Sequence, residues 1–361
     1  MEALRASILH CLADPGEESN PSAWEHFEDG LLVVDDGRII DVGPANALRN
    51  KLPADLAVAD YSGKLIVPGF IDCHVHFPQL DIIGSYGAQL LDWLNQYAYP
   101  AEAKFADPAY AREVANAFVG ELLRNGTTTA LVFGTVHAHS ADVIFEAAAA
   151  RNMRLIAGKV LMDSNCPEAL RDTPESGYAE SKALIERWHG RGRLGYAITP
   201  RFALTSSPEQ LAAAGRLAAE YPDTWIHTHL AENMDEVEQI ARQFPDSRSY
   251  LDVYDRFGLV RKRAVFAHCL HMDEQDRSRM ATNRAAAAFC PTSNLFLGSG
   301  LFDLPAMRKA GVTCGLGTDV GGGTSLSMLR TASEAYKVLH LQEHALPAMR
   351  ALYLATLGAA E

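Results

Sequence analysis

The 361-residue sequence predicts an α/β fold, a TIM-like (β/α)₈ barrel preceded by a small β-rich subdomain. Two observations lead to this expectation. Eight short apolar runs alternate with helical patterns from residue 69 onward, as the strands and helices of a parallel barrel do. The first 66 residues instead carry β segments joined by a turn. A chain of this length is sufficient for one large core and a small additional unit.

The N-terminal subdomain is expected to span residues 1–66. Its clearest feature is the apolar segment Leu31–Val34, which is followed by a turn at Asp36-Gly37 and a second β segment at Arg38–Gly43. This pattern is typical of a β-hairpin. Pro68-Gly69 then marks the start of the barrel, which we expect to span residues 67–361.

The barrel prediction depends on the order of strand and helix patterns. The segment Asp107–Gly126, for example, combines a capping residue, Pro108 in the first turn and apolar residues at every fourth position. An open doubly wound sheet is the alternative, but no glycine-rich phosphate loop follows the first run. The eight expected strands are 69–73, 128–133, 154–161, 194–199, 224–230, 264–268, 286–290 and 312–317.

The composition excludes several classes of partner. The formal net charge is −13 and there is no basic run, so we expect no binding to nucleic acid or to anionic membranes. No apolar stretch has the length of a membrane span, and the N-terminus lacks the pattern of a signal peptide. The six cysteines form no CxxC pair, which indicates free thiols and a cytoplasmic location as the default expectation.

A candidate metal centre begins at the first expected barrel strand, where His74 and His76 are separated by one residue. Side chains two apart on a strand point to the same face, so both imidazoles can reach one ion. Such a pair is weak evidence alone, because His137 and His139 repeat it elsewhere in the chain. We interpret this second pair as loop residues after the second strand.

Further potential ligands follow later strands at equivalent positions. His227 and His229 close the fifth run. His268 closes the sixth, and Asp319 follows the eighth. In a parallel barrel these strand ends share one mouth, where active sites lie. Three His and one Asp from this group would suit Zn²⁺, with Fe²⁺ as the alternative, and such an ion lowers the pKa of a bound water to about 7.

Glu232 lies three residues after His229, just beyond the end of the fifth strand. A carboxylate at the rim of the barrel, beside a metal-bound water, can shuttle protons. The alternative is a first-turn acid of the helix expected to begin near Met234, where acids are favoured in any case. The potential metal ligands beside Glu232 favour the catalytic interpretation.

Four motifs occur in barrel order: PGFIDCHVH, HTHLAEN, VFAHC and GLGTD. Together they resemble the amidohydrolase superfamily. Further stretches are similar to the guanine deaminase family within it, and the likeness covers most of residues 25–361. These stretches are H-x-H-x-x-Q at 74–79, LLDWLN at 90–95, YPAE at 99–102, TPRF at 199–202, HLAEN at 229–233 and GTDVGGG at 317–323.

The resemblance implies a zinc-dependent hydrolase that converts guanine to xanthine and ammonia. The zinc ligands that it implies are His74, His76, His229 and Asp319. His268 would hold the metal-bound water, and the resemblance leaves open whether it also ligates the ion. The purine contacts that it implies are Gln79, Arg201 and Phe202. Arg201 can donate to a carbonyl oxygen that adenine lacks, and Phe202 offers a face for stacking.

In the implied mechanism, Asp319 accepts a proton from the water and Glu232 protonates the ring nitrogen next to the carbon that loses its amine. The resemblance also implies a homodimer. Chains of the family continue beyond the point that corresponds to Glu361, and their tail completes a β-sandwich with the N-terminal hairpin. We therefore expect the hairpin here to lack some partner strands.

Three other functions are alternatives to guanine deamination. Another amidohydrolase, acting on a pterin, an adenosine derivative or a triazine, would keep the metal site, although Gln79 and Arg201 favour guanine. A non-catalytic scaffold on the same fold would be expected to lose metal ligands, and the implied ligands are all present. A zinc deaminase that edits nucleic acids would carry H-x-E…P-C-x-x-C, which this sequence lacks.

Overall fold

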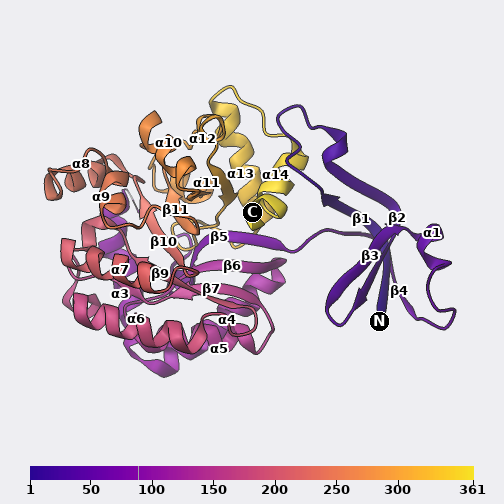
Figure 1. Ribbon diagram of the computed structural model, residues 1–361, viewed down its shortest axis with the longest axis horizontal. Coiled ribbons are helices and arrows are strands. Elements are labelled where there is room, and N and C mark those ends of the chain that lie inside the picture. The colour runs from indigo at the N-terminus through magenta and orange to yellow at the C-terminus, as the bar shows by residue number, and fades with distance from the viewer. Residues whose placement is uncertain (88) are drawn as a thin grey trace.

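The computed structural model describes residues 1–87 and 89–361 and contains two separate β-sheets. A small sheet lies apart from a barrel that is surrounded by helices (Figure 1). The small core of this sheet contains Ala3, Leu31 and Val33, together with Leu48 of α1 (Ala45–Arg49). The strands of the small sheet are β1 (Glu2–Cys11), β2 (Trp24–Asp35), β3 (Arg38–Pro44) and β4 (Val58–Ile66), in the order β3-β2-β1-β4.

The predicted hairpin is confirmed as β2 and β3, which pair antiparallel with Asp35 opposite Arg38. Both turn residues have a left-handed backbone, with φ of 46° at Asp36 and 71° at Gly37. This geometry matches a type I′ turn, for which Asp-Gly is a favoured sequence. Strand β1 pairs antiparallel with β2 and parallel with β4.

The α/β barrel prediction is also confirmed. The barrel strands are β5 (Phe70–His76), β6 (Thr127–Phe133), β7 (Arg154–Gly158), β8 (Val160–Leu161), β9 (Leu194–Pro200), β10 (Trp225–Leu230), β11 (Ala264–His268), β12 (Ala286–Phe289) and β13 (Thr313–Leu316). Their pairings are parallel, and they follow the chain order from β5 to β13. The third expected strand is interrupted at Lys159, which divides it into β7 and β8. Lys159 is fully buried there, and its Nζ lies 2.5 Å from Asp172 Oδ2.

The first and last strands of the barrel meet at a seam that is nearly closed. The backbone N–H of Asp319 donates to the carbonyl oxygen of His74 at 2.8 Å, and the N–H of His76 donates to the carbonyl oxygen of Val320 at 2.8 Å. Beside these bonds, the Thr318 hydroxyl donates to the buried carboxylate of Asp72 at 2.5 Å. The seam therefore fixes the segment after β13 directly against the His-containing end of β5.

The predicted helix start at Asp107 is confirmed, and a second helix begins with the same kind of cap. Asp107 accepts a hydrogen bond from the N–H of Ala109 at the start of α4, and Ser207 accepts one from Gln210 at the start of α7. The helices of the barrel region are α2 (Leu90–Trp93), α3 (Tyr99–Ala103), α4 (Pro108–Arg124), α5 (Ala138–Ala149), α6 (Pro174–Trp188), α7 (Pro208–Glu220), α8 (Met234–Gln243), α9 (Tyr250–Arg256), α10 (Glu274–Thr282), α11 (Pro291–Phe296), α12 (Leu304–Ala310), α13 (Met328–Leu341), α14 (Ala348–Leu354) and α15 (Leu357–Ala360).

Two shorter helical segments lead from β5 toward α3. They are the 3₁₀ helix η2 (Phe77–Ile82) and the π-helix η3 (Leu94–Ala98). One continuous hydrophobic core joins the barrel strands to the surrounding helices. Within residues 1–87 and 89–361, no helix combines the length and the apolar character that are needed to cross a lipid bilayer.

Candidate metal and active site

The structure brings the four expected metal ligands together at the mouth of the barrel. His74 and His76 lie on β5, His229 lies on β10 and Asp319 follows β13, and their ligand atoms all lie within 4.8 Å of one another. His76 Nε2 lies 3.2 Å from His74 Nε2 and 3.2 Å from His229 Nε2. Asp319 Oδ1 lies 3.1 Å from His74 Nε2 and 3.3 Å from His76 Nε2.

The other ring nitrogens of these histidines face polar neighbours, so that each Nε2 is directed to the common centre. His74 Nδ1 lies 2.7 Å from Nε2 of His227, which is a deeper residue of β10. His229 Nδ1 lies 2.6 Å from the carbonyl oxygen of Arg201 and donates to it. Partners of this kind fix the ring orientation of metal-binding histidines.

The charge states of the four groups also suit a cation. Burial lowers the pKa of His76 to about 3 and lowers the pKa of His74 and His229 as well, so these imidazoles are neutral near pH 7. Burial is the largest single effect and raises the pKa of Asp319, but His74, His76 and His268 together outweigh it, and the pKa falls well below its ordinary value. Three neutral imidazoles and one carboxylate form a donor set that fits Zn²⁺.

Glu232 and His268 lie beside this donor set. His268 Nε2 lies 3.3 Å from Glu232 Oε2 and 3.7 Å from Asp319 Oδ2. Its Nδ1 faces the amide oxygen of Asn294 at 2.9 Å, which leaves the lone pair on Nε2. Burial and the negative charge of Asp319 raise the pKa of Glu232 well above its ordinary value. The raised pKa favours a protonated carboxyl group, which can donate a proton.

Left-handed backbone at the strand ends aims these side chains into the mouth. The φ angle is 49° at Ala231, 73° at His268 and 49° at Asp319. Non-glycine residues adopt this conformation at a cost, and such strain is concentrated at functional sites. The turns after β10, β11 and β13 thus share an unusual backbone at the positions that build the site.

Two neighbours of the site belong to none of the sequence motifs that indicate it. Ser299 donates from its hydroxyl to Glu232 Oε1 at 3.3 Å. Cys290 is fully buried, and its thiol forms a second potential ligand group with His268 and Asp319. Burial raises the pKa of Cys290 well above its ordinary value, so the thiol is neutral near pH 7.

The three residues implied to contact the purine occupy different positions. Arg201 and Phe202 line a cavity of about 20 Å³ beside the expected metal ligands, together with Leu90, Leu94, His229 and Glu232. Gln79 is buried and is not among these lining residues. Its Nε2 donates to Glu102 at 2.8 Å, and its Oε1 accepts from the N–H of Gly321 at 3.1 Å.

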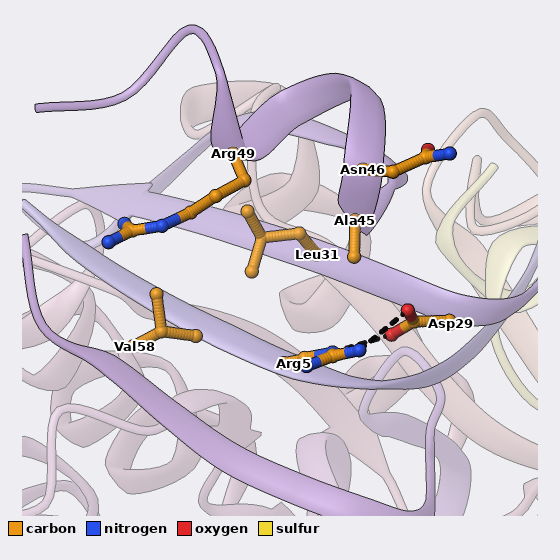
Figure 2. A pocket seen from close by; sticks show the side chains of 7 residues that line it. All are labelled: Arg5, Asp29, Leu31, Ala45, Asn46, Arg49 and Val58. Atoms are coloured by element: carbon orange, nitrogen blue, oxygen red, sulfur yellow. Dashed lines mark hydrogen bonds and ion pairs between the residues drawn. The ribbon is translucent and has the colours of Figure 1, made fainter. Parts of the chain in front are cut away.

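A larger hollow of about 390 Å³ lies on the N-terminal sheet (Figure 2). Arg5 and Asp29 form an ion pair across it at 2.7 Å, and Arg49 extends over it. Its lining contains no His or Cys and no cluster of carboxylates. Size alone therefore does not identify the reactive site, and the small cavity at the barrel mouth is the one that adjoins reactive groups.

The second His-x-His pair corrects part of the sequence interpretation. His137 precedes α5, but His139 lies within its first turn and is not a loop residue. His139 Nε2 lies 2.7 Å from the carbonyl oxygen of Phe105. Since the α5 start carries no side-chain cap, the sequence gives no signal for a helix at this position.

Glu236 supports the segment that carries Glu232. Its Oε2 accepts from the backbone N–H of Glu232 at 3.1 Å and of Asn233 at 3.3 Å. Its Oε1 accepts from the Tyr250 hydroxyl at 2.6 Å. Burial raises the pKa of Glu236 to about 7.

This pKa predicts a pH dependence of stability. The folded protein binds the proton of Glu236 more tightly than the unfolded chain, whose ordinary value is 4.5. The contribution is fully present below that value and is lost as the pH rises to about 7. Glu236→Gln should remove this pH dependence. Between pH 4.5 and about 7, the free energy of unfolding of the variant should therefore rise by up to about 3 kcal/mol relative to that of the wild type. Urea unfolding at several pH values measures the difference, and parallel profiles for the two proteins would contradict the prediction.

Comparison with known proteins places this chain in a family. The model of the amidohydrolase family matches residues 65–361. The chain is 55% identical to guanine deaminase of Escherichia coli K12, covering 100% of this chain and 82% of that protein. The solved structure of E. coli guanine deaminase matches with a TM-score of 0.97 at 53% identity, covering 100% of this chain and 84% of that chain.

A second solved structure carries a ligand. It is guanine deaminase from C. acetobutylicum with guanine bound in the active site, and it matches with a TM-score of 0.92 at 28% identity, covering 99% of this chain and 85% of that chain. Both the sequence and the fold thus match over almost the full chain. The protein therefore belongs to the amidohydrolase family, in the group that contains these guanine deaminases.

Proposed function

We propose that the protein hydrolyses guanine to xanthine and ammonia at this site, with one zinc ion per chain. One observation carries the proposal: a zinc-type donor set, Glu232 and His268 converge beside a cavity lined by Arg201 and Phe202. The similarity to guanine deaminases, one of them with guanine in its active site, supports the choice of substrate.

The ion would be held by His74, His76, His229 and Asp319. When bound, zinc lowers the pKa of a coordinated water to about 7, which provides a hydroxide nucleophile near neutral pH. The lowered pKa values of the imidazoles keep their nitrogen lone pairs free at this pH. Fe²⁺ would fit the same donors.

The neighbouring side chains manage the protons of the reaction. The second carboxylate oxygen of Asp319 accepts a proton from the water as the C–O bond forms at the guanine carbon that carries the amine. Glu232, whose raised pKa favours the protonated form, donates to the adjacent ring nitrogen and makes that carbon more electrophilic. His268 orients the water through Nε2. The amine then takes up the proton that Asp319 accepted and leaves as ammonia. The hydroxyl proton passes to Glu232 as the new carbonyl forms, and xanthine remains.

Recognition of the purine is assigned to Arg201, Phe202 and Gln79. Arg201 donates to the carbonyl oxygen, and Phe202 stacks on the ring. The cavity has room for about one water molecule, so Leu90 and Leu94 must shift to admit a purine. Gln79 Nε2 donates to Glu102 and lies 3.4 Å from His76 Nδ1, and its Oε1 accepts from Gly321, so one lone pair of this oxygen is left for the purine edge.

The test is to incubate zinc-loaded protein with guanine, and in parallel with adenine, cytosine and a pterin, while following ammonia release and ultraviolet absorbance. We expect turnover of guanine to exceed that of the other compounds. Folded, zinc-containing protein that releases no ammonia from guanine would refute the proposal. Turnover of the pterin in its place would favour another amidohydrolase activity.

Two further expectations concern the protein in the cell. The homodimer and the cytoplasmic location stay predictions from the sequence. Light scattering on the purified protein would measure the mass of the assembly, and a monomer would contradict the first. Fractionation of the source cells would test the second.

A further inference from the structure

We propose that Glu102 is a positioning residue that holds both polar groups assigned to purine recognition, Arg201 and Gln79. The inference rests on the proposed guanine deamination. Glu102 lies on α3 and is 1% exposed. Its Oε2 accepts from Arg201 Nη1 at 2.6 Å, and its Oε1 accepts from Gln79 Nε2 at 2.8 Å. One buried carboxylate therefore connects the residue that follows β9 to the η2 segment.

The guanidinium of Arg201 is fixed from two directions. Beside the ion pair with Glu102, its Cζ lies 5.1 Å from the centre of the Tyr99 ring. Arg201 is 2% exposed, and a buried cation is costly unless it is paired. Because the guanidinium is a rigid plane with five N–H donors, these contacts set the direction of its remaining donors. Arg201 also lines the cavity, where those donors can meet a purine carbonyl oxygen.

Glu102 also determines which way the Gln79 amide faces. An ionised carboxylate only accepts hydrogen bonds, so the amide NH₂ must face Glu102. The N–H of Gly321 only donates, so the amide oxygen must face it, as observed at 3.1 Å. If the amide were reversed, its oxygen would face the carboxylate oxygen of Glu102, and its NH₂ would face the N–H of Gly321. Neither contact could then be a hydrogen bond. Gln79 Nε2 also lies 3.4 Å from His76 Nδ1, so the network reaches a proposed zinc ligand.

The first test is Glu102→Gln, which keeps the size of the side chain but replaces one acceptor oxygen with NH₂. In either orientation this NH₂ opposes a donor of Gln79 or Arg201. We expect KM for guanine to rise about tenfold or more, with a smaller decrease in kcat and unchanged zinc content. The preference for guanine over 2-aminopurine, which keeps the amine and lacks the carbonyl, should fall about tenfold.

A matched control distinguishes positioning from a general loss of stability. Asp172→Asn breaks another buried ion pair, in which Lys159 Nζ lies 2.5 Å from Asp172 Oδ2, and neither residue lines the cavity. This variant should have a lower Tm but the wild-type KM and the wild-type ratio of kcat/KM between guanine and 2-aminopurine. If the role of Glu102 were purely structural, Glu102→Gln would likewise show a lower Tm with the wild-type KM and the wild-type ratio.

Glu102→Asp provides a second variant if Glu102→Gln fails to fold. The Asp carboxylate keeps both acceptor oxygens, but its side chain is one methylene shorter and cannot reach both partners at once. The ratio of kcat/KM between guanine and 2-aminopurine should therefore lie between those of wild type and E102Q. Wild-type turnover of guanine with an unchanged ratio in the folded Glu102 variants would overturn the positioning role alone. Absence of wild-type turnover of guanine would overturn the proposed function, and this inference with it.

Discussion

Replacing Glu232 with Gln should lower kcat for guanine by a factor of about 10² to 10⁴, the usual contribution of a general acid or base. Gln has the same size but carries no proton that it can release near neutral pH. In the wild type, burial and the charge of Asp319 raise the pKa of Glu232 well above its ordinary value, so its carboxyl can donate. Glu232 is not among the four donors that converge on the metal site, so zinc content should not change.

Kinetics and zinc analysis on the same preparation measure both expectations. Glu238→Gln is the matched control, because Glu238 is exposed on α8, the helix that follows Glu232, and pairs with Arg242 at 3.7 Å. Its kcat should stay close to wild type. Wild-type activity should also fall as the pH rises through the pKa of Glu232, since the proton donor is then lost, and E232Q should lack this alkaline decrease. A zinc-loaded E232Q enzyme with near-normal kcat would contradict the role.

The fold was largely predictable where a local pattern determines the element. Asp107 and Pro108 indicate the start of α4, and Asp36-Gly37 indicates the turn of the hairpin, because caps and turns depend on adjacent residues. The break of the third strand at Lys159 could not be predicted in this way. The partner of this buried amine is Asp172, which the fold brings to it from another segment.

In the site, too, local patterns predict some residues, and contacts between distant segments determine the others. His74 and His76 share a strand face, and the ends of parallel strands meet, so their approach to His229 follows from general rules. Asn294 on α11 and Ser299 in the loop after it hold His268 and Glu232, but they belong to no recognised pattern. Their contacts exist only after the barrel closes. Supporting residues of this kind are therefore the part of an active site that sequence patterns reveal least.

Removing the metal should abolish turnover, and zinc should restore it. His229→Gln tests the same dependence on the metal by removing one expected ligand. His229 Nε2 lies 3.2 Å from His76 Nε2, so its loss leaves two imidazoles and Asp319 to hold the ion. We expect H229Q to lose zinc at a chelator concentration that leaves the wild type loaded, and to lose turnover with it. Metal analysis before and after chelation measures the loss.

His137→Gln is the matched control for this experiment, because His137 and His139 repeat the His-x-His pair away from the four converging donors. Its zinc content and turnover should equal those of the wild type. Zinc bound to the folded state adds about 4 kcal/mol at a thousandfold excess over Kd, so full removal should lower the Tm of wild type and H137Q but not of H229Q. Equal zinc loss in H137Q and H229Q would contradict the assignment of His229 as a ligand, but not the requirement of the enzyme for zinc. A chelator that strips all zinc from the wild type without changing turnover or Tm would contradict the metal centre itself.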